Sequence, residues 1–377
     1  MAQHEIATPS GNTERALPPF GSSEQSSLCS PLILSKLGEV RTGSVSSLPR
    51  VIAALGGSPQ CVFGAADIDL NKFVNDRELR LDYNETAHLF SIAIRQTQCT
   101  HLGILVGRCF SLKDLGPVGQ LMRYANTAEE ALHDLVTHAK LHDRGAAPLL
   151  LPLTSHLSLL GYVINRHDLA DPRPLVDAAV TIGFQILREL LGPHWAPVRV
   201  QLAYRKPADA ATYTRAFRCP VQFNANVSGM VVINQQLRQK LRTANPCQHQ
   251  LFHETIATAT ASLTTSEQIR HQLHALLLAG EAKAEQIASR IGLHIRTLHR
   301  RLEAEGTHLQ QLMNESRQSL AIQLLTNTNL PVSIIAQSLQ YQDPNAFSRA
   351  FKTWTGCSPQ HWRILSLRGS AGEEFST

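Results

Sequence analysis

A pattern that occurs twice near the end of this 377-residue chain constrains its fold more than any other feature. The first copy begins at Ile287 and the second at Ile335. Each copy has apolar residues at helical spacing before and after a short turn, which predicts two packed helices, the helix-turn-helix unit. The matching positions are Ile287, Ala288, Ile291, Gly292, Leu298 and Leu302 in the first copy, and Ile335, Ala336, Leu339, Gln340, Phe347 and Phe351 in the second.

Residues that begin and end helices support this interpretation. Asp343 followed by Pro344 is typical of a helix start, because an Asp side chain caps backbone N–H groups and proline fits the first helical position. Gly306 and Gly356 stand where the second helix of each copy should end. We therefore expect an all-α domain over residues 266–368. An apolar stripe predicts one long helix that joins the two copies: Leu309, Leu312, Met313, Leu320, Leu324 and Leu325.

The outer face of each second helix is basic and polar. Arg can bond the edge of guanine and Asn that of adenine, while Ser and Lys suit phosphate. A solvated helix face would explain one such copy, but two copies with the same basic face predict binding to double-stranded DNA. A stiff connecting helix would then place both second helices in successive major grooves. The candidate contacts are Arg296, His299 and Arg300 in the first copy, and Asn345, Ser348, Arg349 and Lys352 in the second.

The distribution of charge agrees with a polyanionic partner. The whole chain has a formal net charge of +5. Residues 266–368 hold eleven Lys or Arg and seven Asp or Glu, a net charge of +4. Most of the positive excess therefore lies in the predicted helical domain, where it would attract nucleic acid.

A set of residues across this region forms one shared pattern: Arg300-Arg301-Leu302, Gly306, Arg317, Ala321, Leu324-Leu325, Ile335-Ala336, Ala346-Phe347-Ser348-Arg349-Ala350-Phe351, Trp354-Thr355-Gly356, Ser358-Pro359 and Arg363. In these residues the region resembles the AraC family of bacterial transcription regulators. The resemblance implies a transcription activator that binds promoter DNA as a homodimer and acts with RNA polymerase. Where the family usually has Gly-Phe, this chain has Gln340-Tyr341, so the second turn departs from the pattern.

Residues 32–241 mix helical and strand patterns and predict an α+β domain of about 200 residues. We expect a strand-rich or tightly packed segment at 102–110 around Gly103 and Gly107, a long amphipathic helical region over 115–142, and a hairpin of 149–153 with 157–164. The run from Phe217 to Phe223 and the long helix resemble the sensory domain of one AraC subgroup, the ornithine-utilisation and virulence regulators. That resemblance implies a small-molecule effector and self-association, with the effector and its contact residues unknown; sugar binding is not carried over.

The rest of the chain is predicted from composition. Residues 1–31 are rich in Ser, Pro, Thr and Glu and are expected to be disordered, as is the tail 369–377. Residues 242–265 are expected to be the linker between the domains. The seven cysteines form no CxxC pair, and no signal peptide is seen, which indicates the cytoplasm.

Two further classes of function were weighed against regulation. The chain has no Gly-rich phosphate loop, GxSxG or HExxH motif, so we expect no catalytic residues and no enzyme. Histidine pairs at helical spacing could hold a metal, but no third ligand stands at a recognisable spacing, so we predict neither a metal nor a cofactor. The histidine pairs are His138 with His142, His249 with His253, and His271 with His274.

The remaining alternative to a regulator is a small-molecule-binding or enzymatic protein whose helical domain serves only for association.

Overall fold

The computed structural model describes residues 38–76, 78–164, 169, 171–259 and 263–371. The segment 1–31, expected to be disordered, lies outside the described residues, as do residues 372–377 of the expected C-terminal tail. Among the described helices, none is long and apolar enough to cross a membrane. The six described cysteines are free thiols.

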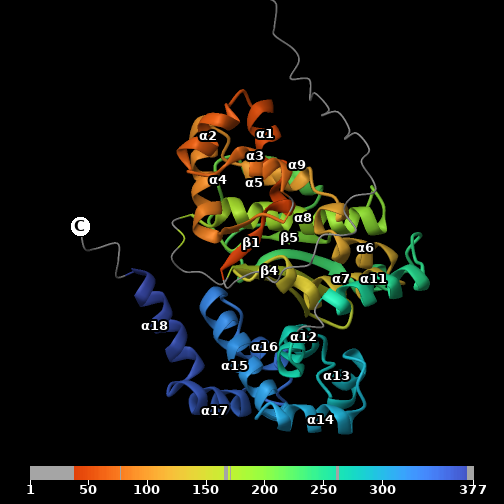
Figure 1. Cartoon of the computed structure of the whole chain (residues 1–377). Coiled ribbons are helices and arrows are strands. Elements are labelled where there is room, and N and C mark those ends of the chain that lie inside the picture. Colours follow the sequence, from red (N-terminus) through yellow and green to blue (C-terminus); the bar gives the residue numbers. More distant parts are fainter. Residues whose placement is uncertain (1–37, 77, 165–168, 170, 260–262, 372–377) are drawn as a thin grey trace, which may run out of the picture. The chain divides into compact units, whose positions relative to one another are not determined.

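The N-terminal domain begins with a group of short helices and a two-stranded sheet (Figure 1). Strand β1 pairs antiparallel with β2, and the helices pack against each other through a core that includes Phe63, Phe73 and Phe90. The elements are β1 Glu39–Arg41, η1 Thr42–Val45, α1 Leu48–Ala54, α2 Pro59–Ala65, α3 Leu70–Asn75, β2 Arg80–Asp82 and α4 Tyr83–Thr97.

The middle of the chain forms a five-stranded sheet with helices beside it. The strand order is β3-β4-β7-β5-β6, antiparallel except for the parallel pair β5 and β6. The hairpin expected at 149–164 is confirmed, with Leu149 opposite Gly161. The elements are α5 Leu102–Arg108, η2 Leu112–Leu115, α6 Pro117–Tyr124, α7 Ala128–His138, η3 Ala139–Leu141, β3 Ala146–Pro152, β4 Leu157–Ile164, α8 Arg173–Leu191, β5 Arg199–Gln201, α9 Ala210–Phe217, β6 Val221–Gln222, β7 Ser228–Ile233 and α10 Asn234–Leu237.

Two expectations for this region were partly wrong. Residues 102–110 are mostly helix α5, so the expected strand is absent, although the alternative of tight packing around the two glycines is present. Gly103 and Gly107 lie one turn apart on α5 and let its backbone approach α8 closely; a Cβ on Gly103 would stand 2.1 Å from the carbonyl oxygen of Pro174. The expected long helix over 115–142 is divided into α6 and α7, because Thr127 begins a new helix by accepting a hydrogen bond from the Glu130 amide.

The segment expected to be a linker, 242–265, contains a helix. Helix α11 spans Pro246–Ala259 and contacts α6. Its Phe252 and Ile256 are buried in the core of the N-terminal domain. This helix therefore belongs, by its packing, to the N-terminal domain.

The C-terminal domain is entirely helical over its described residues. The expected helix-turn-helix pairs are α13 with α14 and α16 with α17, and the long joining helix is α15. Helix α18 runs into the segment 369–377 that was expected to be disordered. The elements are α12 Thr265–Ala279, α13 Ala284–Arg290, α14 Ile295–Ala304, α15 Leu309–Asn327, α16 Val332–Ser338, α17 Pro344–Thr355 and α18 Pro359–Ala371.

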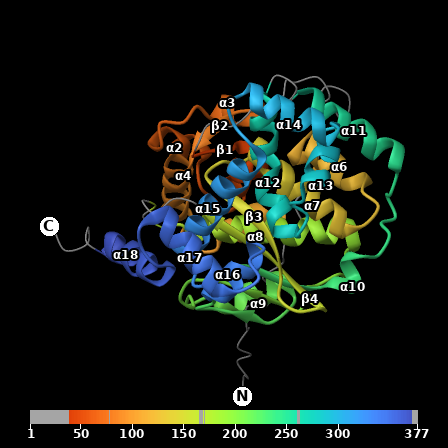
Figure 2. The same ribbon diagram turned by 90° about the horizontal axis from the view of Figure 1, so that it is seen from below.

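The two faces of the five-stranded sheet pack against different domains. Leu160, Met230 and Val232 face one way, into the core formed with α8 and the other N-terminal helices. Their neighbours Leu159 and Val231 face the other way, into a core shared with the C-terminal helices. Helix α12 contacts β3, and helix α15 contacts β4. Alternation along each strand thus gives the sheet two buried faces, with C-terminal helices on one of them (Figures 1 and 2).

Candidate DNA-binding surface and interdomain cleft

Each helix-turn-helix unit is held by side chains on the inner face of its second helix. In α14 these are Leu298 and Leu302, and in α17 they are Phe347 and Phe351, all fully buried. Phe351 also contacts Trp362 of α18 edge to face, with ring centroids 5.8 Å apart. The inner faces are therefore used for packing, and the opposite faces are free to meet a partner.

The structure places six of the seven predicted contacts on exposed surface. In α14, Arg296, His299 and Arg300 are exposed, and in α17, Asn345, Arg349 and Lys352 are exposed. Ser348 differs, because it is half-buried and its hydroxyl donates a hydrogen bond to the Pro344 carbonyl at 2.8 Å. Helices α14 and α17 lie along the same edge of the C-terminal domain, on the side away from the sheet (Figure 1).

The turn that departs from the family pattern keeps the expected conformation. Gly292 in the first unit has a φ of 68°, and Gln340 at the matching position of the second unit has a φ of 62°. A left-handed φ is unfavourable for a residue with a Cβ. The Gln340 amide donates hydrogen bonds to the carbonyls of Leu276 at 3.2 Å and Leu277 at 2.7 Å, near the end of α12. These bonds hold the strained residue in place, on carbonyls that also accept from the backbone amides of Gly280 and Glu281.

Helix α12 is also fixed at its other end. The carboxylate of Glu305, which follows α14, accepts hydrogen bonds from the Thr265 amide at 2.8 Å and the Ser266 amide at 2.9 Å. These amides belong to the first turn of α12, where backbone donors have no partner within the helix. Burial is the largest single influence and raises the pKa of the Glu305 carboxyl group, but the hydrogen bonds from Ser266 and Thr265 together outweigh it, so that pKa is lowered. The first reading unit is therefore tied to α12, which contacts α7 and β3.

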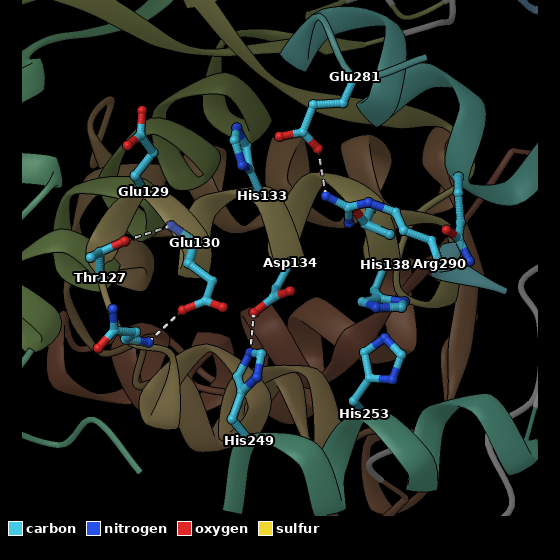
Figure 3. Close-up of a pocket in the computed structure, with 13 residues that line it drawn as sticks. Thr127, Glu129, Glu130, His133, Asp134, His138, His249, His253, Glu281 and Arg290 are labelled. Carbon is cyan, nitrogen blue, oxygen red and sulfur yellow. Dashed lines mark hydrogen bonds and ion pairs between the residues drawn. The ribbon is translucent and has the colours of Figure 1, made fainter. Parts of the chain in front are cut away.

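A polar cleft lies where the N-terminal domain meets α12 and α13 (Figure 3). Its volume is about 720 Å³. His249 donates a hydrogen bond from Nε2 to the Asp134 carboxylate at 2.9 Å, and Arg290 donates to Glu281 at 2.6 Å. The side chains that line it include Glu129, Glu130, His133, Asp134 and His138 of α7, His249 and His253 of α11, and Glu281 and Arg290.

Burial and mutual contact control the ionisation of these groups. Burial raises the pKa of the Asp134 carboxyl, although the hydrogen bond from His249 acts against it. That same hydrogen bond raises the pKa of His249. Burial, with the nearby charges of His271 and His253, lowers the pKa of His138 to about 3, so this imidazole is neutral at physiological pH.

The histidine pairs predicted from sequence differ in their surroundings, and only His249 with His253 share the cleft as a pair. His138, His249 and His253 line the cleft, whereas His142 lies beside Arg41, whose Nη1 is 3.3 Å from its Nδ1. Among the residues that the structure describes, no group of three or more His, Cys, Asp or Glu is placed to hold a metal ion. Sequence reasoning missed the cleft carboxylates. The spacing of Glu130, Asp134 and His138, four residues apart on one helix, was the signal that could have found them.

Comparison with known proteins agrees with both domains. Residues 56–241 match the family described as the arabinose-binding domain of AraC transcription regulators, and residues 287–364 match a helix-turn-helix domain. These two matches cover the sensory domain and both reading units.

Individual relatives match along most of their length. The ornithine utilization regulator of Pseudomonas aeruginosa is 28% identical over 83% of this chain and 93% of its own. The regulator VirS of Mycobacterium tuberculosis is 25% identical over 71% of this chain and 80% of its own. The regulator VqsM of Pseudomonas aeruginosa is 24% identical over 79% of this chain and 92% of its own. The chain therefore belongs to the AraC family of DNA-binding transcription regulators, which are not enzymes, and it combines an N-terminal ligand-binding domain with a C-terminal helix-turn-helix domain.

Proposed function

We propose that α14 and α17 are the reading helices of this regulator, and that Arg296, His299, Arg300, Asn345, Ser348, Arg349 and Lys352 contact promoter DNA. One observation supports this most strongly: both helices fully bury two large apolar residues on their inner face and expose basic or amide side chains at two matching positions of the outer face. These positions are Arg296 with Asn345 and Arg300 with Arg349. Arg300 and Arg349 are the residues best suited to bond guanine, and Asn345 to bond adenine. The hydroxyl of Ser348 already donates to the backbone, so it can donate to a phosphate only by giving up that bond, or contact the phosphate through a water.

The length of α15 fits reading of two grooves. Helix α15 has 19 residues, which corresponds to a length of about 28 Å. Successive major grooves on one side of B-DNA are about 34 Å apart. A rigid connector of this length, with a reading unit at each end, suits simultaneous contact with two grooves by one chain.

The wider regulatory role follows from this proposal. A small-molecule effector in the N-terminal domain controls the placement of the reading units, and the protein acts as a homodimer in the cytoplasm. It acts as an activator that cooperates with RNA polymerase at the promoter. The Gln340 and Glu305 contacts to α12 support such control, because α12 joins the reading units to α7 and β3 of the ligand-binding domain.

Binding to promoter DNA tests the assignment. Arg349→Ala or Arg300→Ala should each lose about 1–3 kcal/mol of binding free energy on the true operator, measured by fluorescence anisotropy. Arg173→Ala is the matched control, because this arginine is exposed on α8 of the other domain. The logarithm of the binding constant should fall with that of salt concentration by about 0.9 per phosphate neutralised.

Two results would contradict these roles. If both variants weaken binding to random DNA as much as to the operator, the arginines contact only phosphate. If the wild-type protein retards no promoter fragment and shows no salt dependence, the reading-helix assignment is wrong and the helical domain serves association.

A further inference from the structure

The cleft beside α7 has the size of an ordinary ligand site. Its volume of about 720 Å³ falls in the range of about 300–1,000 Å³ that is usual for ligand pockets. A second cavity, apolar and bordered by Tyr162 and Gly183, measures about 120 Å³ and falls below that range. The larger cleft is lined mostly by polar side chains, so its ligand must form hydrogen bonds or ion pairs.

One stripe of α7 faces this cleft. Glu130, Asp134 and His138 follow each other at intervals of four residues, which places them on the same side of the helix. His249 and His253 of α11 lie opposite the last two of them, as Figure 3 shows. Carboxylate and imidazole groups from two helices thus converge on one space.

The charges around the cleft are unbalanced. Four carboxylates line it, and Arg290 is the single Lys or Arg among the described lining residues. Arg290 is paired with Glu281 at 2.6 Å, so it compensates a carboxylate of its own domain. Glu129 meets Arg238 at 3.4 Å, but this arginine is 64% exposed and the pair is screened by water. Asp134 is partly compensated by its hydrogen bond from His249, but the carboxylates of the lining still outnumber its cationic groups. The cleft therefore has a negative potential, which attracts cations.

His138, which also lines the cleft, adds a hydrogen-bond acceptor without a partner in the described part of the chain. The residue is 8% exposed, and its Nδ1 is buried without a hydrogen-bond partner among the described residues. Buried polar atoms are normally hydrogen-bonded, so an orphan of this kind points to a missing partner. A neutral imidazole has one nitrogen with a free lone pair, and that lone pair needs a donor.

We propose that the cleft binds a small diamine, with one ammonium group beside Glu130 and the other donating hydrogen bonds to Asp134 and His138. An ammonium group has three N–H donors and no acceptor, so it suits carboxylate and imidazole acceptors. Four residues of helix separate Glu130 from Asp134 by about 6 Å, which suits a ligand with two such groups. An anion would meet Glu130 and Asp134 and be repelled, and a neutral alcohol would leave their charge uncompensated. The binding itself is independent of the regulatory scheme; its role as the effector signal rests on the proposed function.

The position of the cleft gives the ligand a route to the reading units. Glu281 and Arg290 belong to the C-terminal domain, and Arg290 ends α13, the helix that packs against α14. A cation bound on α7 also lies close enough to share the cleft with the Glu281 carboxylate. Occupation of the cleft therefore favours one arrangement of α13 relative to α7.

Calorimetric titration of the full-length protein with three compounds of equal length tests the ligand class. We expect saturable binding of 1,4-diaminobutane, and none of 1,4-butanediol or butanedioate at about 10 mM. Glu130→Gln and Asp134→Asn should each weaken diamine binding about tenfold, because each removes one charge from the site. Asp209→Asn is the matched control: this carboxylate also pairs with a histidine, His101 at 3.0 Å, but lies outside the cleft lining.

The outcomes separate the site from the function. Equal binding of the diol or of butanedioate, no binding of the diamine, or full affinity in both cleft variants with wild-type melting temperatures would overturn the site. Asp134 is buried, so Asp134→Asn could lose binding because it fails to fold. Glu130 is only half-buried, so Glu130→Gln should stay folded and keeps the test valid. If the diamine binds but does not alter promoter affinity, the site stands and its regulatory role fails. Failure of all DNA binding would instead count against the proposed function alone.

Discussion

The acid sensitivity of the protein should depend on His138. This imidazole is buried at the contact between α7 and the helices around it, and its pKa is lowered to about 3 from an ordinary value of 6.5. The groups that face it are His271 of α12, His249 and His253 of α11, and Arg290 of α13. All of them disfavour a positive charge on the ring, and burial disfavours it most.

The sign and size of the effect follow from proton linkage. Because the folded-state pKa lies below the unfolded one, the unfolded chain takes up the proton first as the pH falls. The contribution to stability is therefore complete above pH 6.5 and is lost progressively between pH 6.5 and pH 3. At about pH 5 the loss amounts to about 2 kcal/mol relative to about pH 7.5.

Urea unfolding of wild type and His138→Gln, followed by circular dichroism at about pH 7.5 and about pH 5, measures this loss. The variant has no group to protonate at this position, so its free energy of unfolding should fall by about 2 kcal/mol less than that of wild type. His133→Gln, a half-buried histidine of the same helix, is the control and should follow wild type. Equal pH slopes for wild type and His138→Gln would show that this imidazole is not held neutral by burial.

Two further predictions concern packing and helix ends. Gly103→Ala should destabilise the protein by about 1–3 kcal/mol or more, because the new Cβ would meet the Pro174 carbonyl of α8 at 2.1 Å. The control Gly64→Ala should be neutral or stabilising, because a Cβ at that position has nothing within 4 Å. A lower melting temperature only in Gly64→Ala would refute the argument. Glu305→Ala should cost about 0.5–2 kcal/mol, because the amides of Thr265 and Ser266 lose their acceptor. Thermal unfolding checks this against Glu303→Ala, an exposed residue of α14, and equal melting temperatures for the two variants would contradict a capping role.

The C-terminal domain could be predicted from sequence because its signals are local. Asp343 does cap α17, accepting from the Asn345 and Ala346 amides, and Gly306 and Gly356 take the left-handed conformation at the ends of the reading helices. Apolar residues at helical spacing correctly identified the buried faces, with Leu298 and Phe347 fully buried. Each of these inferences needs only a few neighbouring residues.

The errors and omissions arose where distant segments decide the outcome. Gly103 and Gly107 lower the helix propensity of α5, and only the close contact with α8 compensates for this loss. The cleft joins α7 to α11, two helices more than a hundred residues apart in sequence, as the pairing of Asp134 with His249 shows. The pattern of α7 alone contains the stripe of acidic and imidazole side chains, but not the second helix that turns it into a site.

The sheet that has no solvent-facing side limits how this protein can be engineered. Leu159 and Val231 form part of an apolar surface that is shielded from water by the C-terminal helices. An N-terminal domain expressed without the C-terminal helices would expose this apolar surface to water and tend to aggregate. Chimaeras that exchange DNA-binding domains between regulators would therefore also have to preserve or redesign the apolar contact between the sheet and the C-terminal helices. This holds however well the new reading helices bind DNA.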